Sequence, residues 1–213
     1  MSEADTKAHW EKVYRRNPPE AVSWYRPHLE TSVDLIERVA QGRGASIGPG
    51  TSIIDVGGGE STLVDDLLDR GFHNVTVLDI SETAIETSKQ RLGAMAELVR
   101  WIAADVTAAA FERAAYDVWH DRAVFHFLTT AEQRIAYVVN VTRAVKIGGH
   151  VIVGTFGPEG PTKCSGLDVV RYDAAALHGE FGAHFRAVES REEIHRTPSG
   201  VVQQYLFCLC RME

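Results

Sequence analysis

The glycine run Gly57–Gly59 is the part of this sequence best suited to binding a small ligand. It follows the β-branched segment 52–56 and precedes an apolar-periodic helix at 60–70. Glycine has no Cβ, so its backbone can turn tightly and also approach a bound molecule closely. The order of strand, glycine turn and helix therefore predicts a nucleotide-like ligand at the carboxyl end of the strand.

Three aspartates mark the ends of three successive predicted strands, and each can accept hydrogen bonds from such a ligand. Asp55 lies near the end of the first strand, Asp79 ends the second and Asp105 follows the third. Asp79 comes about 20 residues after the glycines, where a carboxylate can accept from both ribose hydroxyls. Asp105 is placed to accept from the adenine amine. Each aspartate alone could instead cap a helix, but their common register favours a ligand site.

The residues that follow the glycines argue against a pyrophosphate ligand. Thr62 stands where a dinucleotide-binding turn has its third glycine. Glu60 would repel a pyrophosphate at the helix N-terminus, where the helix dipole favours the anion of the ligand itself. S-adenosylmethionine has no phosphate and carries a sulfonium cation, so acidic neighbours favour it. Asp79 taken alone fits NAD equally well.

Five segments in order resemble the motifs of class I S-adenosylmethionine-dependent methyltransferases, and the resemblance extends from about Ser52 to the C-terminus. Ser61 replaces the usual last glycine of the first motif. The five segments are Asp55–Ser61, Leu78–Ser81, Ala104–Val106, Tyr116–Arg122 and Val145–Val151. The resemblance implies that S-adenosylmethionine is the methyl donor and S-adenosylhomocysteine the product. The cofactor-binding residues are expected to be Asp55, Gly57, Gly58, Gly59, Ser61, Thr62, Asp79, Ile80, Ser81, Asp105, Val106 and Asp121.

Strands and helices are expected to alternate along the chain, which is typical of a parallel sheet with helices on both faces. The expected strands are 52–56, 75–78, 98–103, 116–119, 150–155, 186–195 and 201–212. The expected helices are 5–16, 28–41, 60–70, 82–92, 108–113, 131–145 and 173–181. The turn at 197–200 makes the last two strands an antiparallel hairpin.

The resemblance implies an α/β fold with a Rossmann-like, doubly wound, seven-stranded sheet. Its expected strand order is 3-2-1-4-5-7-6, with strand 7 antiparallel to its neighbours. We expect residues 1–50 to form a helical N-terminal extension that acts as a cap or lid. Residues 51–213 are expected to form the S-adenosylmethionine-binding methyltransferase domain as one globular unit.

Methyl transfer from a sulfonium is an in-line displacement, so the enzyme mainly has to hold the nucleophile near the methyl carbon in a dry pocket. No metal is required. His126 and Asp121, which follow the fourth strand, are the candidate catalytic residues. His126 could take a proton from the nucleophile, and Asp121 could orient a substrate group or hold the methionine amine. The alternatives are that His126 packs between Phe125 and Phe127 and that Asp121 caps a helix.

The loops after the fourth and fifth strands and the aromatic N-terminal segment are expected to contact the methyl acceptor. The candidate residues are Trp24, Tyr25, Arg122, Phe125 and Cys164. Arg122 could bind a substrate anion or form a surface ion pair. The N-terminal aromatic residues could form a lid over cofactor and acceptor, or they could only cover the edge of the sheet. Cys164, Cys208 and Cys210 could contact a soft acceptor such as a thiol or a metalloid, although buried cysteine more often fills the core.

Composition and charge are those of an ordinary globular protein. The 213 residues include 22 basic and 29 acidic side chains, a net charge of −7 without a dense basic block, so no nucleic-acid partner is expected. No apolar run reaches the ~20 residues of a membrane span, and the N-terminus lacks a signal-peptide pattern. The three cysteines match neither a disulfide framework nor a zinc spacing. We expect a cytoplasmic protein without a metal or a membrane partner, and its oligomeric state stays open.

The acceptor is expected to be a small molecule, because little of the chain remains for a domain that docks protein or RNA. A protein-lysine methyltransferase is the enzymatic alternative. A non-catalytic protein that only binds S-adenosylmethionine is the second alternative, and an NAD oxidoreductase is the third.

Overall fold

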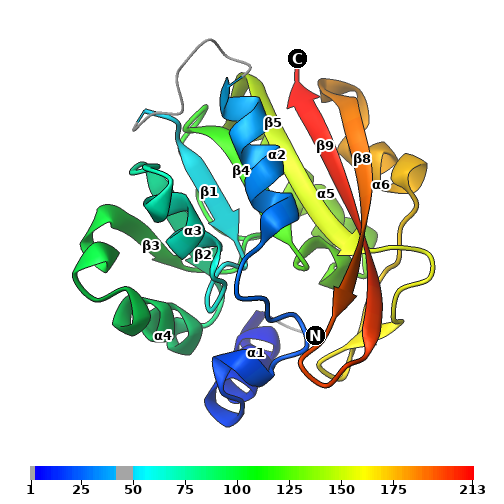
Figure 1. Cartoon of the computed structure of the whole chain (residues 1–213). Coiled ribbons are helices and arrows are strands. Elements are labelled where there is room, and N and C mark those ends of the chain that lie inside the picture. Colours follow the sequence, from blue (N-terminus) through cyan, green and yellow to red (C-terminus); the bar gives the residue numbers. More distant parts are fainter. Residues whose placement is uncertain (1–2, 42–49) are drawn as a thin grey trace.

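A seven-stranded mixed sheet forms the centre of the molecule (Figure 1). A computed structural model describes residues 3–41 and 50–213. The sheet has the order β3-β2-β1-β4-β5-β9-β8, in which β1 to β5 are parallel and β9 is antiparallel to both neighbours. Its strands are β1 (Ile53–Val56), β2 (Val75–Asp79), β3 (Val99–Ala103), β4 (Tyr116–Arg122), β5 (Val145–Phe156), β8 (Phe185–Arg196) and β9 (Val202–Met212). The predicted strand order is confirmed, with β9 as the antiparallel seventh strand.

Helices cover both faces of this sheet. In Figure 1, α2 and α3 lie in front of the central strands, and α5 and α6 lie behind them. The helices are α1 (Glu3–Arg16), α2 (Glu30–Gln41), α3 (Leu63–Asp69), α4 (Glu82–Leu92), α5 (Ala131–Ala144) and α6 (Ala174–Phe181). The doubly wound arrangement places the connections after β1, β2 and β4 along one edge of the sheet, where ligands bind in folds of this kind. Among the described residues, no helix combines the length and apolarity needed to cross a bilayer.

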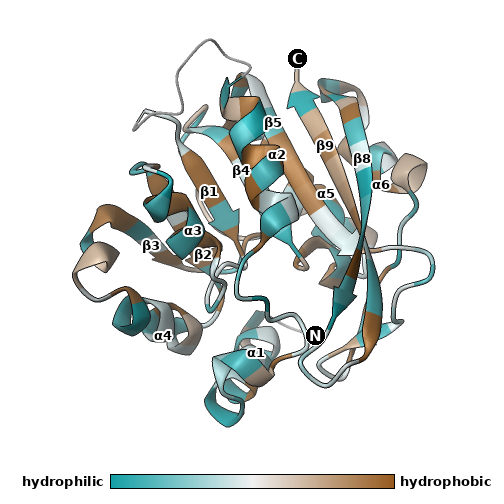
Figure 2. Cartoon of the chain, viewed as in Figure 1, coloured by the Kyte–Doolittle hydropathy of each residue, from teal (hydrophilic) through white to brown (hydrophobic). Residues whose placement is uncertain are grey.

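Neighbouring residues of a strand supply two separate core layers, because side chains alternate between the faces of a sheet. Ile53 of β1 packs with α2 and α3, whereas Ile54 packs with α5 on the other face. All four residues of β1 are buried, as expected for a strand covered on both sides. Figure 2 shows the corresponding apolar colour along the central strands. The two layers hold the strand ends, and therefore the turns that follow them, in fixed positions.

The structure differs from the expected elements in several places. β5 begins at Val145, five residues before the expected start at residue 150, and β4 extends to Arg122 instead of residue 119. Residues 108–113 form turns and irregular chain rather than a short helix. Side chains of α5 bind carbonyl groups in and beside this segment. Arg143 donates to the Phe111 carbonyl at 2.8 Å, and Asn140 donates at 2.8 Å to the carbonyl of Val106, two residues before the segment. The loop expected after the fifth strand contains a small antiparallel hairpin, β6 (Lys163–Cys164) and β7 (Leu167–Asp168).

Helix α1 lies apart from the sheet and next to α4, as the lower part of Figure 1 shows. None of its residues is fully buried, although several side chains, Tyr14 among them, are partly buried. The Glu11 carboxylate accepts from the backbone N–H of Glu82 at 2.7 Å and from that of Thr83 at 3.3 Å, at the N-terminus of α4. An anion at this end of a helix is favourable because the helix dipole is positive there. Of the expected cap at 1–50, residues 1–2 and 42–49 lie outside the described residues.

Candidate active site

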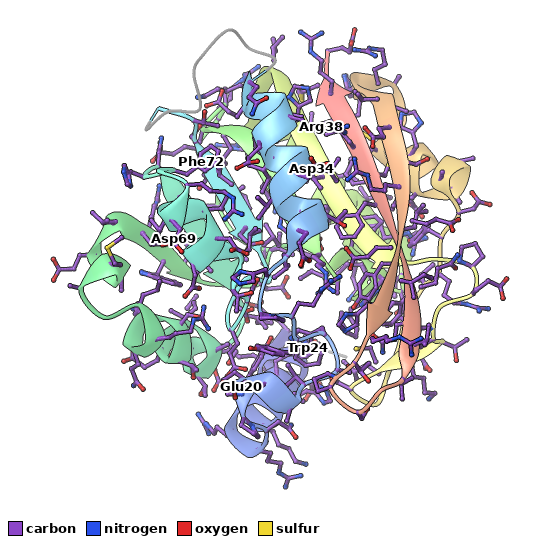
Figure 3. All side chains as sticks on the ribbon, in the orientation of Figure 1. Glu20, Trp24, Asp34, Arg38, Asp69 and Phe72 are labelled. Atoms are coloured by element: carbon purple, nitrogen blue, oxygen red, sulfur yellow. The ribbon has the colours of Figure 1, made fainter. Side chains whose placement is uncertain are left out.

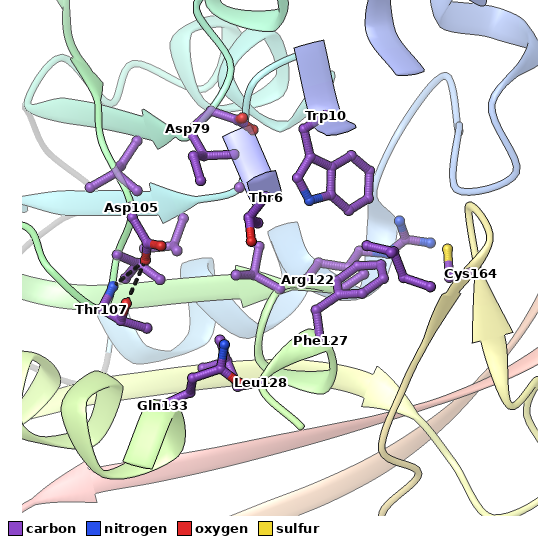
Figure 4. Close-up of a pocket in the computed structure, with 18 of the residues that line it drawn as sticks. Thr6, Trp10, Asp79, Asp105, Thr107, Arg122, Phe127, Leu128, Gln133 and Cys164 are labelled. Atoms are coloured by element: carbon purple, nitrogen blue, oxygen red, sulfur yellow. Dashed lines mark hydrogen bonds between the residues drawn. The ribbon is translucent and has the colours of Figure 1, made fainter. Parts of the chain in front are cut away.

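A cavity of about 360 Å³ lies at the edge of the sheet where the parallel strands end. The turns after β1, β2, β3 and β4 form its floor. Three α1 residues spaced four apart, Thr6, Trp10 and Tyr14, line its roof and therefore share one face of the helix. Figure 4 shows Asp79 and Asp105 on one side of the cavity and Arg122 and Cys164 on the other. The cavity is thus acidic at one end and contains an arginine at the other.

The three glycines after β1 leave no room for a Cβ atom. Gly57 has a φ of +70°, and a Cβ there would lie 2.1 Å from the side chain of Val124. A Cβ on Gly58 would lie 2.3 Å from a carboxylate oxygen of Asp55, and one on Gly59 2.6 Å from an oxygen of Asp79. The glycines therefore allow the turn to pack directly against two of the acidic side chains.

Asp79 and Asp105 are held in place by short hydrogen bonds from backbone N–H groups. Asp79 is buried and accepts from Gly59 at 3.0 Å and from Ser81 at 2.8 Å. Burial raises the pKa of Asp79 to about 6. Asp105 accepts from the N–H of Thr107 at 2.8 Å and from its hydroxyl at 2.7 Å. Both carboxylates line the cavity, together with Ile80 and Val106.

A second, smaller cavity of about 30 Å³ adjoins the glycine turn and is lined by Asp55 and Glu60. One carboxylate oxygen of each residue is buried and has no hydrogen-bond partner among the described residues. The other oxygen of Asp55 is bonded to Nδ1 of His120 at 2.7 Å. Burial and the nearby charge of Asp79 raise the pKa of Glu60 to about 7. These unpaired oxygens suit a cationic group of a ligand.

Ser61, Thr62 and Ser81 hold the turns in place through their hydroxyl groups. The Ser61 hydroxyl accepts from the N–H of Leu63 at 3.1 Å, and the Thr62 hydroxyl donates to the Arg26 carbonyl at 2.9 Å. Both residues also line the smaller cavity. Ser81 is buried and caps α4 by accepting from the N–H of Ala84 at 3.2 Å.

His126 is buried beneath the larger cavity and is not among the residues that line it. Its ring packs between those of Phe127 and Phe156, with centroids 4.5 and 4.6 Å away. Burial and the positive charge of Arg122 lower the pKa of His126 to about 3. Such a histidine is a weak base without access to an acceptor, so the predicted general-base role does not fit its position. The alternative that it packs between Phe125 and Phe127 fits in part, because Phe127 is one partner but Phe156 takes the place of Phe125.

Asp121 also lies below the cavity instead of lining it. One oxygen accepts from the N–H of Val124 at 2.8 Å, and the other accepts from the N–H of Phe125 at 3.1 Å and the Tyr137 hydroxyl at 2.7 Å. Burial raises the pKa of Asp121 to about 6. The carboxylate therefore fixes the short 3₁₀ turn at 125–127, so the capping alternative fits and the predicted contacts with cofactor and acceptor do not.

Of the five residues expected to contact the methyl acceptor, four line at least one of the two cavities and Phe125 does not. Trp24, Arg122 and Cys164 line the larger cavity, whereas Tyr25 lines the smaller one. Trp24 lies next to α1 (Figure 3), and its ring centroid is 5.9 Å from that of Trp10. Phe125 is fully buried and does not line either cavity, because its ring packs on Tyr137 and Phe181. The predicted contact of Phe125 with the acceptor therefore does not fit.

The cysteines occupy two separate regions. Burial raises the pKa of the Cys164 thiol, which lines the larger cavity. Cys208 and Cys210 lie on one face of β9 with their sulfur atoms 3.5 Å apart, inside the core layer of α5 and α6. The three thiols therefore do not form one site. Among the described residues, no group of three or more potential metal ligands is present.

Several residues at the site were missed by sequence reasoning. Thr6 lines the roof, and its signal was present in the sequence because it lies four residues before Trp10. Phe127, Leu128 and Gln133 line the wall below it. These three residues follow a tight turn, and the spacing of residues in the sequence does not determine the directions of side chains after such a turn.

Residues 54–153 match the family described as "Methyltransferase domain". A curated relative, the eEF1A lysine and N-terminal methyltransferase of Mus musculus, is 25% identical over 150 residues, which are 68% of this chain and 20% of that protein. The chain thus spans about a fifth of the length of the curated relatives that it matches.

Two solved structures share the fold over nearly the whole chain. One comes from a study of the conversion of a disulfide bond into a thioacetal group during echinomycin biosynthesis. It has a TM-score of 0.77 and 16% identity, and covers 98% of this chain and 92% of its own. The other is the 1,6-didemethyltoxoflavin-N1-methyltransferase of Burkholderia thailandensis with bound 1,6-didemethyltoxoflavin and S-adenosylhomocysteine. It has a TM-score of 0.66 and 17% identity, and covers 100% of this chain and 91% of its own.

Proposed function

We propose that the chain is a class I S-adenosylmethionine-dependent methyltransferase and that it methylates a small-molecule nucleophile. The match of residues 54–153 to a methyltransferase domain and the fold shared with a methyltransferase that binds S-adenosylhomocysteine support the first part of this proposal. The observation that carries this proposal is the roofed cavity. Thr6, Trp10 and Tyr14 of α1 cover part of the carboxyl edge of the sheet, so the reacting groups lie in a partly covered pocket instead of an open groove. Pockets of this size and aromatic character are typical of small-ligand sites.

The proposed cofactor site combines the three strand ends. Asp79 accepts from the ribose hydroxyls, and Asp105 accepts from the adenine amine. The turn at Gly57–Gly59 lets the backbone approach the adenosyl group, and the unpaired oxygens of Asp55 and Glu60 face the cationic methionine end. The support for this placement is that the acidic side chains line two adjoining cavities that share Gly57.

S-adenosylmethionine supplies an electrophilic methyl carbon next to a sulfonium cation. The residues of this chain position the reactants and exclude water, which favours a displacement in which charge disperses. The Trp10 ring packs edge-on against those of Trp24 and Phe127, at centroid distances of 5.9 and 5.0 Å, and these three rings line the cavity. The pKa of Tyr14 is raised well above its usual range by burial and by the charges of Asp79 and Glu60. Its phenol therefore stays protonated and can donate a hydrogen bond in the pocket.

Methylation of a protein amine is the alternative acceptor class. It is favoured by the curated relatives, which are named as eEF1A lysine and N-terminal methyltransferases. A protein that binds S-adenosylmethionine without turnover is the second alternative. The roofed cavity favours the small molecule over both, because it encloses space beyond the acidic half, next to Arg122 and Cys164.

A methyl-transfer experiment separates these possibilities. The protein is incubated with methyl-tritiated S-adenosylmethionine and a cell extract that has been divided into a small-molecule filtrate and retained protein. We expect label in the filtrate only, and we expect the Asp79→Ala variant to transfer little, since it lacks the proposed ribose contact. Label in the retained protein would favour the protein amine. Binding of S-adenosylhomocysteine without transfer to either fraction would favour the non-catalytic alternative.

A further inference from the structure

The Arg122 guanidinium is buried at the end of the cavity opposite Asp105 (Figure 4). Its side chain is only 6% exposed. It lies over the ring of Tyr205, with the central carbon 4.5 Å from the ring centroid, and one nitrogen donates to the Trp24 carbonyl at 3.0 Å. Stacking on β9 and a hydrogen bond to the N-terminal segment thus hold the guanidinium in one orientation.

The second terminal nitrogen of Arg122 is not satisfied by the protein. It is buried and has no hydrogen-bond partner among the described residues. The nearest carboxylate oxygen is that of Glu193 at 3.8 Å, which is longer than a charge-assisted hydrogen bond. The same Glu193 oxygen forms a 3.0 Å ion pair with Arg26. One carboxylate is therefore shared between two arginines, and it lies closer to Arg26 than to Arg122.

An unpaired N–H of a buried cation is energetically unfavourable, so it indicates a position that a ligand completes. The positive charge of Arg122 also acts on neighbouring groups, because it helps to lower the pKa values of His126 and His195. A guanidinium presents a planar fork of N–H donors that matches a carboxylate. The residues beside it in the cavity include the aromatic rings of Trp24 and Phe127.

We propose that the methyl acceptor is a carboxylate-bearing small molecule whose anionic group binds the free N–H of Arg122 while its apolar part packs among the aromatic residues of the cavity. The inference rests on the proposed function and specifies its substrate class. It gives the two ends of the cavity opposite roles, because the acidic end receives the cationic cofactor and the arginine end receives an anionic acceptor. This division also disfavours binding of the acceptor in the place of the cofactor.

The cofactor carries a carboxylate of its own, and Arg122 also lines the smaller cavity. Two observations favour the acceptor as the source of the anion. Arg122 stacks on Tyr205 of β9 and shares its end of the larger cavity with Cys164 of β6, whereas Asp55 and Glu60, the proposed contacts of the methionine end, line only the smaller cavity. The experiment therefore measures cofactor binding and acceptor binding separately.

Affinities are measured by calorimetry, first for S-adenosylhomocysteine and then, on the protein saturated with it, for matched pairs of acid and amide. The pairs are benzoate with benzamide, phenylacetate with phenylacetamide, and indole-3-acetate with indole-3-acetamide. We expect the acid of at least one pair to bind about tenfold or more tightly than its amide, as charged hydrogen bonds do. Arg122→Gln is expected to abolish this preference, and Arg122→Lys to keep part of it. Arg186→Gln is the matched control, because Arg186 is an exposed arginine of β8 that pairs with Glu213 and lines neither cavity, so its loss should leave the preference intact.

Each other outcome overturns part of the reasoning. Absence of a preference in every pair, or an equal preference in Arg122→Gln, contradicts the inference. A tenfold loss of S-adenosylhomocysteine affinity in Arg122→Gln, with unchanged affinity for 5′-methylthioadenosine, shows that the anion is the cofactor's own carboxylate. If the wild-type protein does not bind S-adenosylhomocysteine, the proposed function fails instead. Should Arg122→Gln not fold, Glu193→Gln serves as the second variant, and it is expected to strengthen carboxylate binding because it removes the competing anion.

Discussion

Cofactor affinity is expected to rise with pH, because Glu60 must be ionised to attract the cationic methionine end. With a pKa of about 7, Glu60 is about one-tenth ionised at pH 6 and about nine-tenths ionised at pH 8. An apparent dissociation constant scales inversely with the competent fraction, so the affinity should increase about tenfold over this range. Asp79, with a pKa of about 6, should add a further factor of about two.

The matched comparison is between the wild-type protein and Glu60→Gln, with calorimetric titration of S-adenosylhomocysteine at pH 6, 7 and 8. The glutamine keeps the shape of the side chain but cannot ionise, so its affinity should change only about twofold, the part that belongs to Asp79. At pH 7 the wild-type protein should also release protons on binding, which appears as a dependence of the heat on the buffer. Equal pH dependence in both proteins would refute the role of Glu60.

Without ligand, the folding stability of the protein is expected to change with pH in the direction opposite to the cofactor affinity. A carboxyl group whose pKa is raised by folding binds more protons in the native state than in the unfolded state, so its contribution to stability falls as the pH rises from its ordinary range through the folded pKa. For Glu60 this window extends from about 4.5 to about 7. Without ligand, Glu60→Gln should therefore gain thermal stability relative to the wild-type protein as the pH rises from 5 to 8. A melting-temperature difference that is constant over this range would contradict the burial of an ionisable Glu60.

Three further variants test the floor of the site. Asp79→Ala should weaken S-adenosylhomocysteine binding at least about tenfold, or about 1.4 kcal/mol, as loss of a charged hydrogen-bond acceptor does; unchanged calorimetric affinity in a folded variant would remove the ribose assignment. Gly57→Ala should lose cofactor affinity and melt at a lower temperature, because its φ of +70° and the side chain of Val124 both exclude a Cβ; wild-type values in both measurements would contradict that geometry. Tyr137→Phe removes the 2.7 Å hydrogen bond that the hydroxyl donates to buried Asp121 and the 2.9 Å hydrogen bond that it accepts from Trp119. It should lower the free energy of unfolding by at least about 1.5–3 kcal/mol, measured by denaturant titration; a loss well below this range would show that Asp121 and Trp119 find other partners.

The fold and the cofactor side of the site could be predicted because they depend on features that are local in the sequence. The order of strands and helices follows from short β-branched runs and apolar periodicity, and a parallel sheet brings the ends of its strands to one edge. Asp79, Asp105 and the glycine turn lie directly at these ends. Their positions relative to the cavity are therefore nearly determined once the strands are recognised.

Side-chain direction after β4 could not be predicted in the same way. Ala123 has a φ of 75°, which turns the chain immediately after Arg122. As a result Arg122 and Val124 line the cavity, whereas Asp121, Phe125 and His126 are buried below it. A sequence places all of these residues at the sheet edge, but one backbone angle decides which of them a ligand can reach.

Contacts between distant segments were also beyond sequence reasoning. Glu193 lies 167 residues after Arg26 in the sequence, yet the two form an ion pair. The same carboxylate lies 3.8 Å from Arg122. Glu11 binds the N-terminus of α4 more than 70 residues away. Neither pairing has a local pattern, because each depends on the final packing of the hairpin β8–β9 or of α1.

The attachment of α1 has a consequence for the exchange of cofactor and product. The helix has no fully buried residue, and its bonds to α4 are made by Glu11 and by the ion pair of Lys7 with Glu82 at 2.7 Å. The Lys7–Glu82 pair is exposed and weakens as ionic strength increases, whereas the Glu11 contact, which is mostly buried, and the apolar layers around the sheet are screened less. We therefore expect dissolved salt to loosen the roof selectively and to speed the release of bound nucleoside, while the melting of the sheet itself changes little.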